Sequence, residues 1–290
     1  MLSDIERCRR FSRAVTKVTG ALDTSFLGRG RPLGVARVLN AIGHGRQDVG
    51  DVRAYLGLDS GLMSRILRTL EEEGLIIVTP DPDDQRKRRA TLTPAGEAEY
   101  GEYERLSDER AEGLLTPHPK ANPILEAMDL LASALLKDQW EVVELDPRDP
   151  VSRYCLEEYY AELNRRFDGG FDVKRSADPD AKDMIPPRGS FLVCLSDGMP
   201  LACVGLKGTD KGYAEIKRLW VAPAARGLGL ARRMMADTEA RARELGISVL
   251  RLDTNKRLPE AIDFYRKDGW VEIDRFNDDP YPDYFFEKLL

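Results

Sequence analysis

The sequence predicts two domains, a mainly helical one over residues 1–139 and an α+β one over residues 140–290. Three observations support this division. The chain has 290 residues, which is long for one domain and comfortable for two. Helical spacing dominates up to Thr116, with one short β-like pair, before prolines at 117, 119 and 123 interrupt it. Beyond Trp140, strand-like and helix-like segments alternate.

Composition limits the classes of function. Hydrophobic residues make up 42% of the chain and charged residues 32%, as in a typical globular protein. Residues 1–140 carry 20 Lys and Arg against 22 Asp and Glu, and the remainder carries 24 against 28, so the net charge of −6 divides into −2 and −4. Neither part has the basic excess of a non-specific nucleic-acid binder. Any DNA binding therefore requires a local basic patch.

No metal site, secretion signal or membrane span is expected. The four cysteines are never two or three positions apart, and there are only two histidines. The N-terminal MLSDIERCRR lacks the apolar core of a signal peptide. No apolar run approaches the roughly 18 residues that span a bilayer. We expect a cytoplasmic protein with reduced thiols.

The first domain contains a helix-turn-helix pattern. A helix over QDVGDVRAYLG is followed by a tight turn and a second helix over DSGLMSRILRTLEEEG, which Asp59 or Ser60 can cap. In this second helix Leu62, Ile66, Leu67 and Leu70 form the expected buried stripe. The other face presents polar and basic residues, which makes it a candidate for reading DNA. The candidate contacts are Ser60, Ser64, Arg65 and Arg68.

A basic β-hairpin is expected directly after these helices. LIIVTP and ATLT read as its strands, and DPDDQRKRR forms its tip. Basic residues at such a tip can reach phosphates or a minor groove beside a helix that lies in the major groove. Taken alone, the basic tetrad RKRR is better explained as a solvated loop. Next to a helix-turn-helix it becomes a candidate DNA contact, with Arg86, Lys87, Arg88 and Arg89 as the residues concerned.

The order of these elements, the LEEEGLI junction and DPDDQRKRRATLTPAG together resemble the MarR family of winged-helix regulators over about residues 5–138. The resemblance implies a winged helix-turn-helix fold and a homodimer that binds a palindromic operator in double-stranded DNA. It also implies that the helices near residues 5–27 and 96–137 form the dimer interface.

The elements of the second domain follow in order. EVVEL reads as a strand, SRYCLEEYYAELNRRF as a helix, and FLVCLSD and PLACVGLK as two strands around a tight turn. AEIKRLWVAP is a further strand that leads into the helix ARGLGLARRMMADTEARARELG. The strand ISVLRLDT, the helix PEAIDFYRKDG and the closing strands WVEI and YFFEKLL complete the domain.

The loop between AEIKRLWVAP and its helix contains two glycines. Glycines let a backbone turn sharply, and the first amides of a helix favour anions, so the geometry suits a phosphate or pyrophosphate. A Walker loop is excluded because Gly-Lys-Ser or Gly-Lys-Thr is absent. The loop also lacks the third glycine of the dinucleotide-binding motif GxGxxG. A plain strand-to-helix turn without ligand remains open on these residues.

The pattern V-x-P-x-x-R-G-x-G-x-A, within this order of elements, resembles the acetyl-CoA motif of the GNAT acetyltransferases over about residues 140–290. The resemblance implies the α+β GNAT acyl-CoA N-acyltransferase fold with a mixed central sheet. It implies that the loop amides bind the pyrophosphate and that the preceding strand splays from its neighbour to pair with pantetheine. The implied acetyl-CoA contacts are Leu219, Trp220, Val221, Arg226, Gly227, Leu228, Gly229, Leu230 and Ala231.

A second block, Asp253-Thr-Asn255 followed by AIDFYRKDGW, supports the same family. By resemblance Asn255 contacts the cofactor arm. Glu215 matches the general base that takes the proton of the amine, and Tyr265 matches the acid that protonates the departing thiolate. Each has a plainer alternative. Glu215 can be an ordinary cleft or surface carboxylate, and Tyr265 can be a packed aromatic ring.

The acceptor is expected to be a small amine or an amino-acid-like molecule. In this family the first helix of the domain and its following loop shape the acceptor site. The candidates there are Tyr154, Glu158, Arg166, Asp168 and Asp172, although a charged helix face is often only solvated.

Three functions follow. The first is a bifunctional transcriptional regulator and acetyl-CoA-dependent N-acetyltransferase. The second is a non-enzymatic regulator whose GNAT half only senses acetyl-CoA or a metabolite. In the third, the winged helix mediates dimerisation or protein contacts only.

Overall fold

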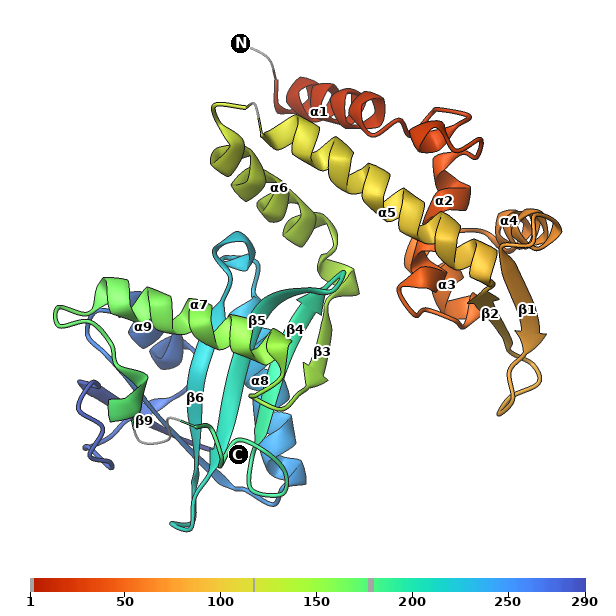
Figure 1. Cartoon of the computed structure of the whole chain (residues 1–290). Helices are drawn as coiled ribbons and strands as arrows, with labels where there is room; N and C mark the ends of the chain where they lie inside the picture. Colours follow the sequence, from red (N-terminus) through yellow and green to blue (C-terminus); the bar gives the residue numbers. More distant parts are fainter. Residues whose placement is uncertain (1–2, 117, 177–179) are drawn as a thin grey trace. The chain divides into compact units, whose positions relative to one another are not determined.

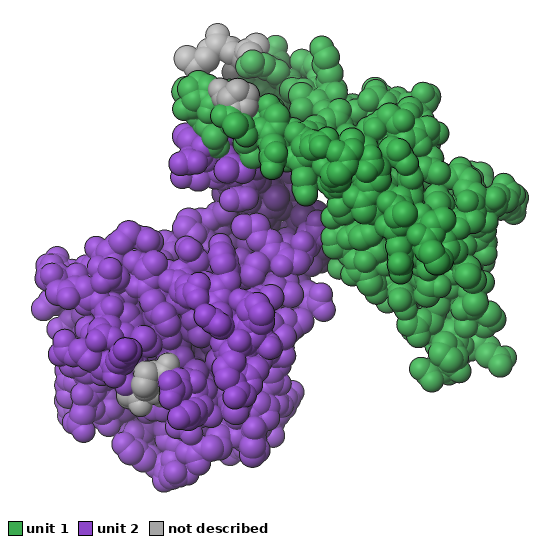
Figure 2. Space-filling view, viewed as in Figure 1, with its two compact units in different colours: residues 1–121 green, residues 122–290 purple. Residues whose placement is uncertain are grey.

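The computed structural model describes residues 3–116, 118–176 and 180–290, which form two compact units, residues 1–121 and 122–290 (Figure 2). Each unit has its own hydrophobic core. The division groups the helix Ala121–Leu135 with the second unit. The domain boundary at residues 139 and 140 stays a prediction.

The first unit is helical with one β-hairpin (Figure 1). Its helices are α1 (Asp4–Val18), α2 (Leu33–Gly43), α3 (Val49–Leu56), α4 (Ser60–Glu72) and α5 (Pro94–Leu115), with a 3₁₀ turn at Phe26–Gly28. The hairpin joins β1 (Ile76–Pro80) to β2 (Arg88–Leu92) in antiparallel register, with Val78 opposite Ala90.

Local signals explain the helix-turn-helix. Asp48 caps α3, and Gly57 ends it in the left-handed conformation with φ of 64°. The Asp59 side chain accepts a hydrogen bond of 2.8 Å from the Leu62 amide and so begins α4, which settles the choice between Asp59 and Ser60. The buried stripe of α4 is Met63, Ile66, Leu67 and Leu70. Leu62, which was expected in this stripe, is only half-buried because Met63 takes the innermost position.

The junction between the hairpin and α5 requires a glycine. Thr93 caps α5 and also donates a hydrogen bond of 2.6 Å to the Gly74 carbonyl. A Cβ at Gly96 would stand 1.9 Å from the Leu75 carbonyl oxygen, far inside van der Waals contact. The TPAG segment that follows the wing therefore packs α5 directly against the start of β1.

The second unit begins with α6 (Ala121–Leu135) and contains a sheet of seven strands with helices on both faces (Figure 1). The strands are β3 (Glu141–Glu144), β4 (Ser190–Ser196), β5 (Met199–Gly208), β6 (Ala214–Val221), β7 (Val249–Thr254), β8 (Val271–Glu272) and β9 (Tyr284–Leu289). The helices are α7 (Pro150–Arg166), α8 (Leu230–Glu244) and α9 (Pro259–Lys267), and 3₁₀ turns lie at Lys137–Gln139, Val173–Arg175 and Pro223–Ala225.

The strand order is β3-β4-β5-β6-β7-β9-β8. Only β6 and β7 run parallel, because α8 connects them, and the other neighbours are antiparallel. The predicted mixed central sheet is confirmed. The core lies between this sheet and the helices that cover it, with Phe191, Val204, Met234 and Phe286 fully buried.

Candidate functional site

The glycine loop turns the chain from β6 into α8. Gly227 and Gly229 adopt φ values of 77° and 88°, in the region that other residues rarely enter, and a Cβ added at either position would meet no atom within 4 Å. Gly229 is the N-cap of α8, so the free amides of the first turn of this helix lie beside the loop. Arg226 is fixed by hydrogen bonds from its Nε to the Val221 carbonyl (3.0 Å) and from its Nη2 to Glu162 (2.5 Å).

Strands β6 and β7 separate before they reach this loop. Their paired residues end at Ile216 opposite Leu252, although β6 continues to Val221 and β7 to Thr254. On its other side β6 stays paired with β5 as far as Val221 opposite Ala202. The predicted splay is thus present, and it leaves the backbone edge of the last residues of β6 turned toward the gap.

A cleft follows the splay and the glycine loop. Of the residues expected to contact the cofactor, Leu219, Trp220, Val221, Arg226, Gly227, Gly229, Leu230 and Ala231 line it. Leu228 does not, because its side chain packs against the hydrophobic core. Asn255 lines the adjoining cavity instead, where its amide donates a hydrogen bond of 2.6 Å to the Tyr281 carbonyl.

A second cavity adjoins the cleft, and both are lined by Tyr159, Leu163, Leu219, Leu258, Ala261 and Tyr265. Tyr265 on α9 is only 6% exposed and packs against Trp270 and Phe286. Burial raises the pKa of Tyr265, and burial with Tyr265 nearby also raises the pKa of Tyr159. Both phenols therefore keep their protons at neutral pH, as a proton donor must.

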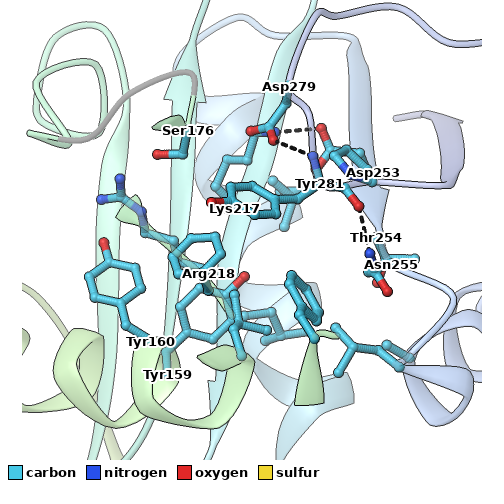
Figure 3. A pocket seen from close by; sticks show the side chains of 18 of the residues that line it. Tyr159, Tyr160, Ser176, Lys217, Arg218, Asp253, Thr254, Asn255, Asp279 and Tyr281 are labelled. Carbon is cyan, nitrogen blue, oxygen red and sulfur yellow. Dashed lines mark hydrogen bonds and ion pairs between the residues drawn. The ribbon is translucent and has the colours of Figure 1, made fainter. Parts of the chain in front are cut away.

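Aromatic and charged groups line the rest of the second cavity (Figure 3). Tyr160 stacks on Phe171 at 5.6 Å, and Phe171 contacts Tyr281 at 4.8 Å between ring centroids. Lys217 forms a hydrogen-bonded ion pair of 2.6 Å with Asp253. Burial opposes the charged form of Lys217, but Asp253 and Glu215 outweigh it and raise the pKa of this lysine.

Glu215, the expected base, lies beyond this ion pair. Its carboxylate is 4% exposed and stands 3.2 Å from Lys217 and 3.8 Å from Lys207. It lines neither the cleft nor the second cavity but a separate depression with Arg275 and Asn277. Among the residues that the structure describes, the carboxylates that line the second cavity are those of Asp253 and Asp279. The role of Glu215 as the base stays a prediction, and the residues of β6 that line the second cavity are residues 216–219, which follow Glu215.

Comparisons with known proteins bear on both units. The family model "Acetyltransferase (GNAT) family" matches residues 156–270, and the model "MarR family" matches residues 29–87. The chain is 34% identical to an IAA acetyltransferase of Azospirillum brasilense, over 49% of this chain and 87% of that protein. This chain belongs to the GNAT acetyltransferase family. Its N-terminal region is of the MarR family.

Two more similarities concern the GNAT region. The chain is 28% identical to the uncharacterized N-acetyltransferase YjgM of Escherichia coli, over 43% of this chain and 78% of that protein. A GNAT acetyltransferase structure from Staphylococcus aureus covers 52% of this chain and 98% of its own, with 17% identity and a TM-score of 0.46. The family places this GNAT protein among acyltransferases that use a cofactor of the coenzyme A type.

The expected acceptor residues of the GNAT domain do not come together. Tyr154 is exposed against the edge of Trp220, and Glu158 lies outside both cavities. Asp168 forms an ion pair with Arg257, and the Asp172 side chain accepts a hydrogen bond from the Lys174 amide. Only the Asp172 backbone is near the second cavity, through its bonds to the Tyr281 hydroxyl.

Arg166 lines the cofactor cleft of the GNAT domain. Its guanidinium pairs with Glu260 and Glu162 and donates a hydrogen bond of 2.9 Å to the Arg257 carbonyl. These bonds hold the pKa of Glu260 below its usual range. Since both carboxylates already neutralise it, Arg166 joins α7 to α9 rather than facing the second cavity.

The MarR region presents most of its candidate DNA contacts to solvent. Ser60, Ser64, Arg65 and Arg68 are exposed on α4, and Arg86, Lys87 and Arg88 are exposed at the hairpin. Arg86 is bonded to Asp84 at 3.0 Å. Arg89 differs, because it is half-buried, donates to Gln47 and lies 3.9 Å from Asp81. Its side chain fastens the hairpin to the segment before α3.

Sequence patterns missed several residues that shape the GNAT cavity: Tyr159, Tyr160, Lys217 and Arg218. The only available signal was the density of aromatic residues in the helix 150–166. Within the described ranges, no group of three or more His, Cys, Asp or Glu is arranged to hold a metal ion. Over the same residues, no helix combines the length and apolarity needed to cross a membrane.

Proposed function

We propose that this protein is a DNA-binding regulator that also transfers the acetyl group of acetyl-CoA to a small amine. The observation that supports the enzymatic part is the junction of the two cavities. There a cleft lined by glycine-loop backbone meets an aromatic, charged cavity, and the protonated phenol of Tyr265 lies between them.

The cleft fits the cofactor by its chemistry. Open space faces Gly227 and Gly229, and the unpaired amides at the start of α8 suit a pyrophosphate. The freed edge of β6 suits an arm that carries its own amides. Acetyl-CoA bound there would supply an activated acetyl thioester. Gly227, Gly229 and Leu230 would hold the pyrophosphate end, and Leu219 to Val221 the pantetheine end.

The reaction needs a proton donor for the thiolate and a proton acceptor for the amine, and two different residues at the junction suit these roles. Tyr265 keeps its proton because burial raises its pKa, so it suits donation to a departing thiolate. Asp253 lines the acceptor cavity and suits acceptance of the amine proton, directly or through water. In this proposal Glu215 positions Lys217 from behind, rather than acting as the base expected from resemblance.

The enzymatic proposal is tested by release of free thiol from acetyl-CoA with a panel of primary amines. Wild-type protein is expected to release thiol only when an amine is present, with equimolar acetylated amine detected by mass spectrometry. If acetyl-CoA binds tightly but no amine is acetylated, the GNAT domain is a sensor, and the non-enzymatic alternative replaces this proposal.

DNA binding is proposed from the exposed basic residues of α4 and the hairpin. Arg88 is the clearest phosphate contact, because it is exposed and lies on β2 beside the tip. A duplex of about 30 base pairs, selected from a random pool by the wild-type protein, is a suitable probe. Arg88→Ala should weaken its binding and reduce the salt dependence by about one counterion per lost phosphate contact. Arg243→Ala, a surface arginine of the GNAT domain, is the matched control.

A homodimer is proposed from the apolar residues that the two ends of the MarR-like region expose. Helix α1 has 15 residues and none is buried, while Ile5, Phe11, Val15 and Val18 are exposed. Helix α6 separately exposes Leu125, Met128, Leu130, Leu131 and Leu135. Isolated helices of this length are only marginally stable in water, so we expect a second copy of the chain to bury these apolar residues. Sedimentation equilibrium should show twice the chain mass, and Phe11→Asp should shift it toward the monomer.

A further inference from the structure

Strand β6 departs from regular alternation where it lines the acceptor cavity. In a regular strand successive side chains point to opposite faces, yet the four consecutive residues 216–219 all line this cavity. The cause is a bulge, because the register between β5 and β6 shifts between Cys203 and Gly205. At the bulge Arg218 adopts φ of 58°, which is unusual for a residue with a side chain.

The bulge places a buried cation in the cavity wall. Arg218 is 8% exposed, and its guanidinium carbon lies 5.7 Å from the centroid of the Tyr160 ring. In Figure 3 its side chain extends toward Tyr160, on the side of the cavity away from Lys217 and Asp253. A guanidinium keeps its charge at any accessible pH and matches the two oxygens of a carboxylate. The bulge thus brings a guanidinium to this end of the cavity.

Flat apolar surface lies beside Arg218. Tyr160 stacks on Phe171 with ring planes 21° apart, and Phe171 contacts Tyr281. Tyr281 is fixed in place, since its hydroxyl accepts a hydrogen bond of 2.9 Å from the Asp172 amide. These three rings come from α7, the loop after it and the segment before β9, so the fold builds an aromatic wall from distant parts of the chain.

The opposite side of the cavity carries the carboxylates. Asp253 and Asp279 line it beside Asn255 (Figure 3), and Asp253 is close enough to Tyr265 to help raise the pKa of this phenol. Among the described residues, the carboxylates of Asp253 and Asp279 and the ammonium of Lys217 line one end of the cavity, and a buried guanidinium lines the other. Such a cavity does not suit a polyamine, whose charges are all positive. It suits a molecule that carries one amine and one carboxylate, with an apolar body between the aromatic rings.

We propose that the acceptor is an α-amino acid with an aromatic or large apolar side chain, and that Arg218 binds its carboxylate. This inference rests on the proposed acetyltransferase function and specifies its substrate class. The carboxylate is bound at the Arg218 end, the side chain packs on Tyr160, Phe171 and Tyr281, and the amine faces Asp253 and Tyr265. The amine nitrogen forms the new bond to the acetyl carbonyl carbon and loses a proton to Asp253, directly or through water, while the C–S bond breaks and the thiolate gains a proton from Tyr265. Arg218 is thus a specificity-determining residue.

The test compares amino acids with the amines that lack only the carboxylate, in the full-length protein with acetyl-CoA. The pairs are L-phenylalanine with 2-phenylethylamine, L-tyrosine with tyramine, and L-tryptophan with tryptamine. At least one amino acid should exceed its partner in kcat/KM by about 10- to 150-fold, the range expected for hydrogen bonds to a charged group. Arg218→Gln should remove this preference, mainly through KM, and leave the amine within about threefold of wild type. Arg153→Gln, an exposed arginine on α7, is the matched control.

Several outcomes separate the claims. If amines are acetylated without preference for the carboxylate, or if Arg218→Gln lowers both members of a pair equally, the inference is overturned while the enzymatic function stands. If no amine is acetylated, the enzymatic function fails. Calorimetry of the same amino acids with the CoA-bound protein then tests whether Arg218 binds their carboxylate. Binding by wild type that Arg218→Gln abolishes upholds the carboxylate site, and absence of binding overturns it. Arg218→Lys and an unchanged acetyl-CoA affinity control for misfolding.

Discussion

The cofactor cleft and the acceptor cavity adjoin and share Tyr265, but the chain builds them in different ways. The part of the cleft that suits the pyrophosphate and the pantetheine arm is one contiguous stretch, from the end of β6 through Gly229 into α8, and side chains of α7 and α9 line the rest. The cavity is formed by side chains from α7, the loop after it, the bulge of β6 and the segment around Tyr281. A common cofactor can thus be held by a local motif, while the acceptor is selected by residues that only the fold brings together.

The largest expected effect concerns Tyr265, where the two regions meet. Tyr265→Phe removes the proposed proton donor but keeps the packing against Trp270 and Phe286. Turnover should fall by about 10²- to 10³-fold, the range for loss of general acid catalysis, with acetyl-CoA affinity unchanged. Steady-state thiol release and calorimetry measure the two quantities. Tyr154→Phe, an exposed tyrosine outside both cavities, should leave turnover unaltered, and a similar loss there would refute the specific role of Tyr265.

The pH dependence gives a related test. Burial raises the pKa of Tyr265 above the ordinary value near 10, so this phenol stays protonated at pH values where an exposed tyrosine ionises. The alkaline decline of kcat, measured at saturating acceptor, should therefore begin above pH 10. A decline with a midpoint at 8 or 9, in the range where the protein stays folded, would contradict the assignment of Tyr265 as the acid.

Two carboxylates compete for the role of base on the acceptor side. Asp253→Asn should lower kcat by about 10²-fold if this carboxylate takes the amine proton. Glu215→Gln should cost about tenfold or less, because Glu215 acts through Lys217 and lines neither cavity. The variant with the lower kcat identifies the carboxylate that acts as the base. A larger loss in Glu215→Gln would restore the assignment that family resemblance suggests.

A smaller effect is expected when the cleft is strained at its backbone. Gly229→Ala forces a side chain into φ of 88°, and Gly246→Ala does the same at 75° beyond the other end of α8. Neither Cβ would meet an atom within 4 Å, so both variants should lose similar stability, about 1–2 kcal/mol each. Only Gly229→Ala should also weaken acetyl-CoA binding, by about tenfold. Thermal unfolding measures the stability of the two variants, and calorimetry measures their affinity for acetyl-CoA. Equal affinities would argue against pyrophosphate binding by the glycine loop.

The smallest effect is expected at Tyr281. Tyr281→Phe keeps the ring of the aromatic wall but removes the hydroxyl that bonds the Asp172 backbone. The acceptor KM should rise by about three- to fivefold through the looser loop, with little change in kcat or in acetyl-CoA affinity. Steady-state kinetics with varied acceptor measures this. An unchanged KM would show that the aromatic wall holds its position without that bond.

The sequence predicted the two regions unequally, and the reason is physical. The order of elements along the chain and the glycine loop follow from local patterns, and family resemblance indicated Tyr265, so the lining of the cleft was predictable apart from Leu228, which turns into the core, and Asn255, which lines the cavity. The cavity was not. Period-two alternation cannot predict that a bulge brings Arg218 and Lys217 to one cavity. Arg166 was also expected at the acceptor site, yet it pairs with Glu162 on its own helix and with Glu260 on α9.

Outside the residues that line both regions, we expect cofactor binding and acceptor choice to depend on different side chains. This expectation is tested most directly by the acetyl-CoA dissociation constant and the acceptor kcat/KM of the same three variants, Arg218→Gln, Asp253→Asn and Tyr281→Phe. The account predicts dissociation constants within about threefold of wild type, while kcat/KM spans about two orders of magnitude. Dissociation constants that rise in parallel with the losses in kcat/KM would contradict it.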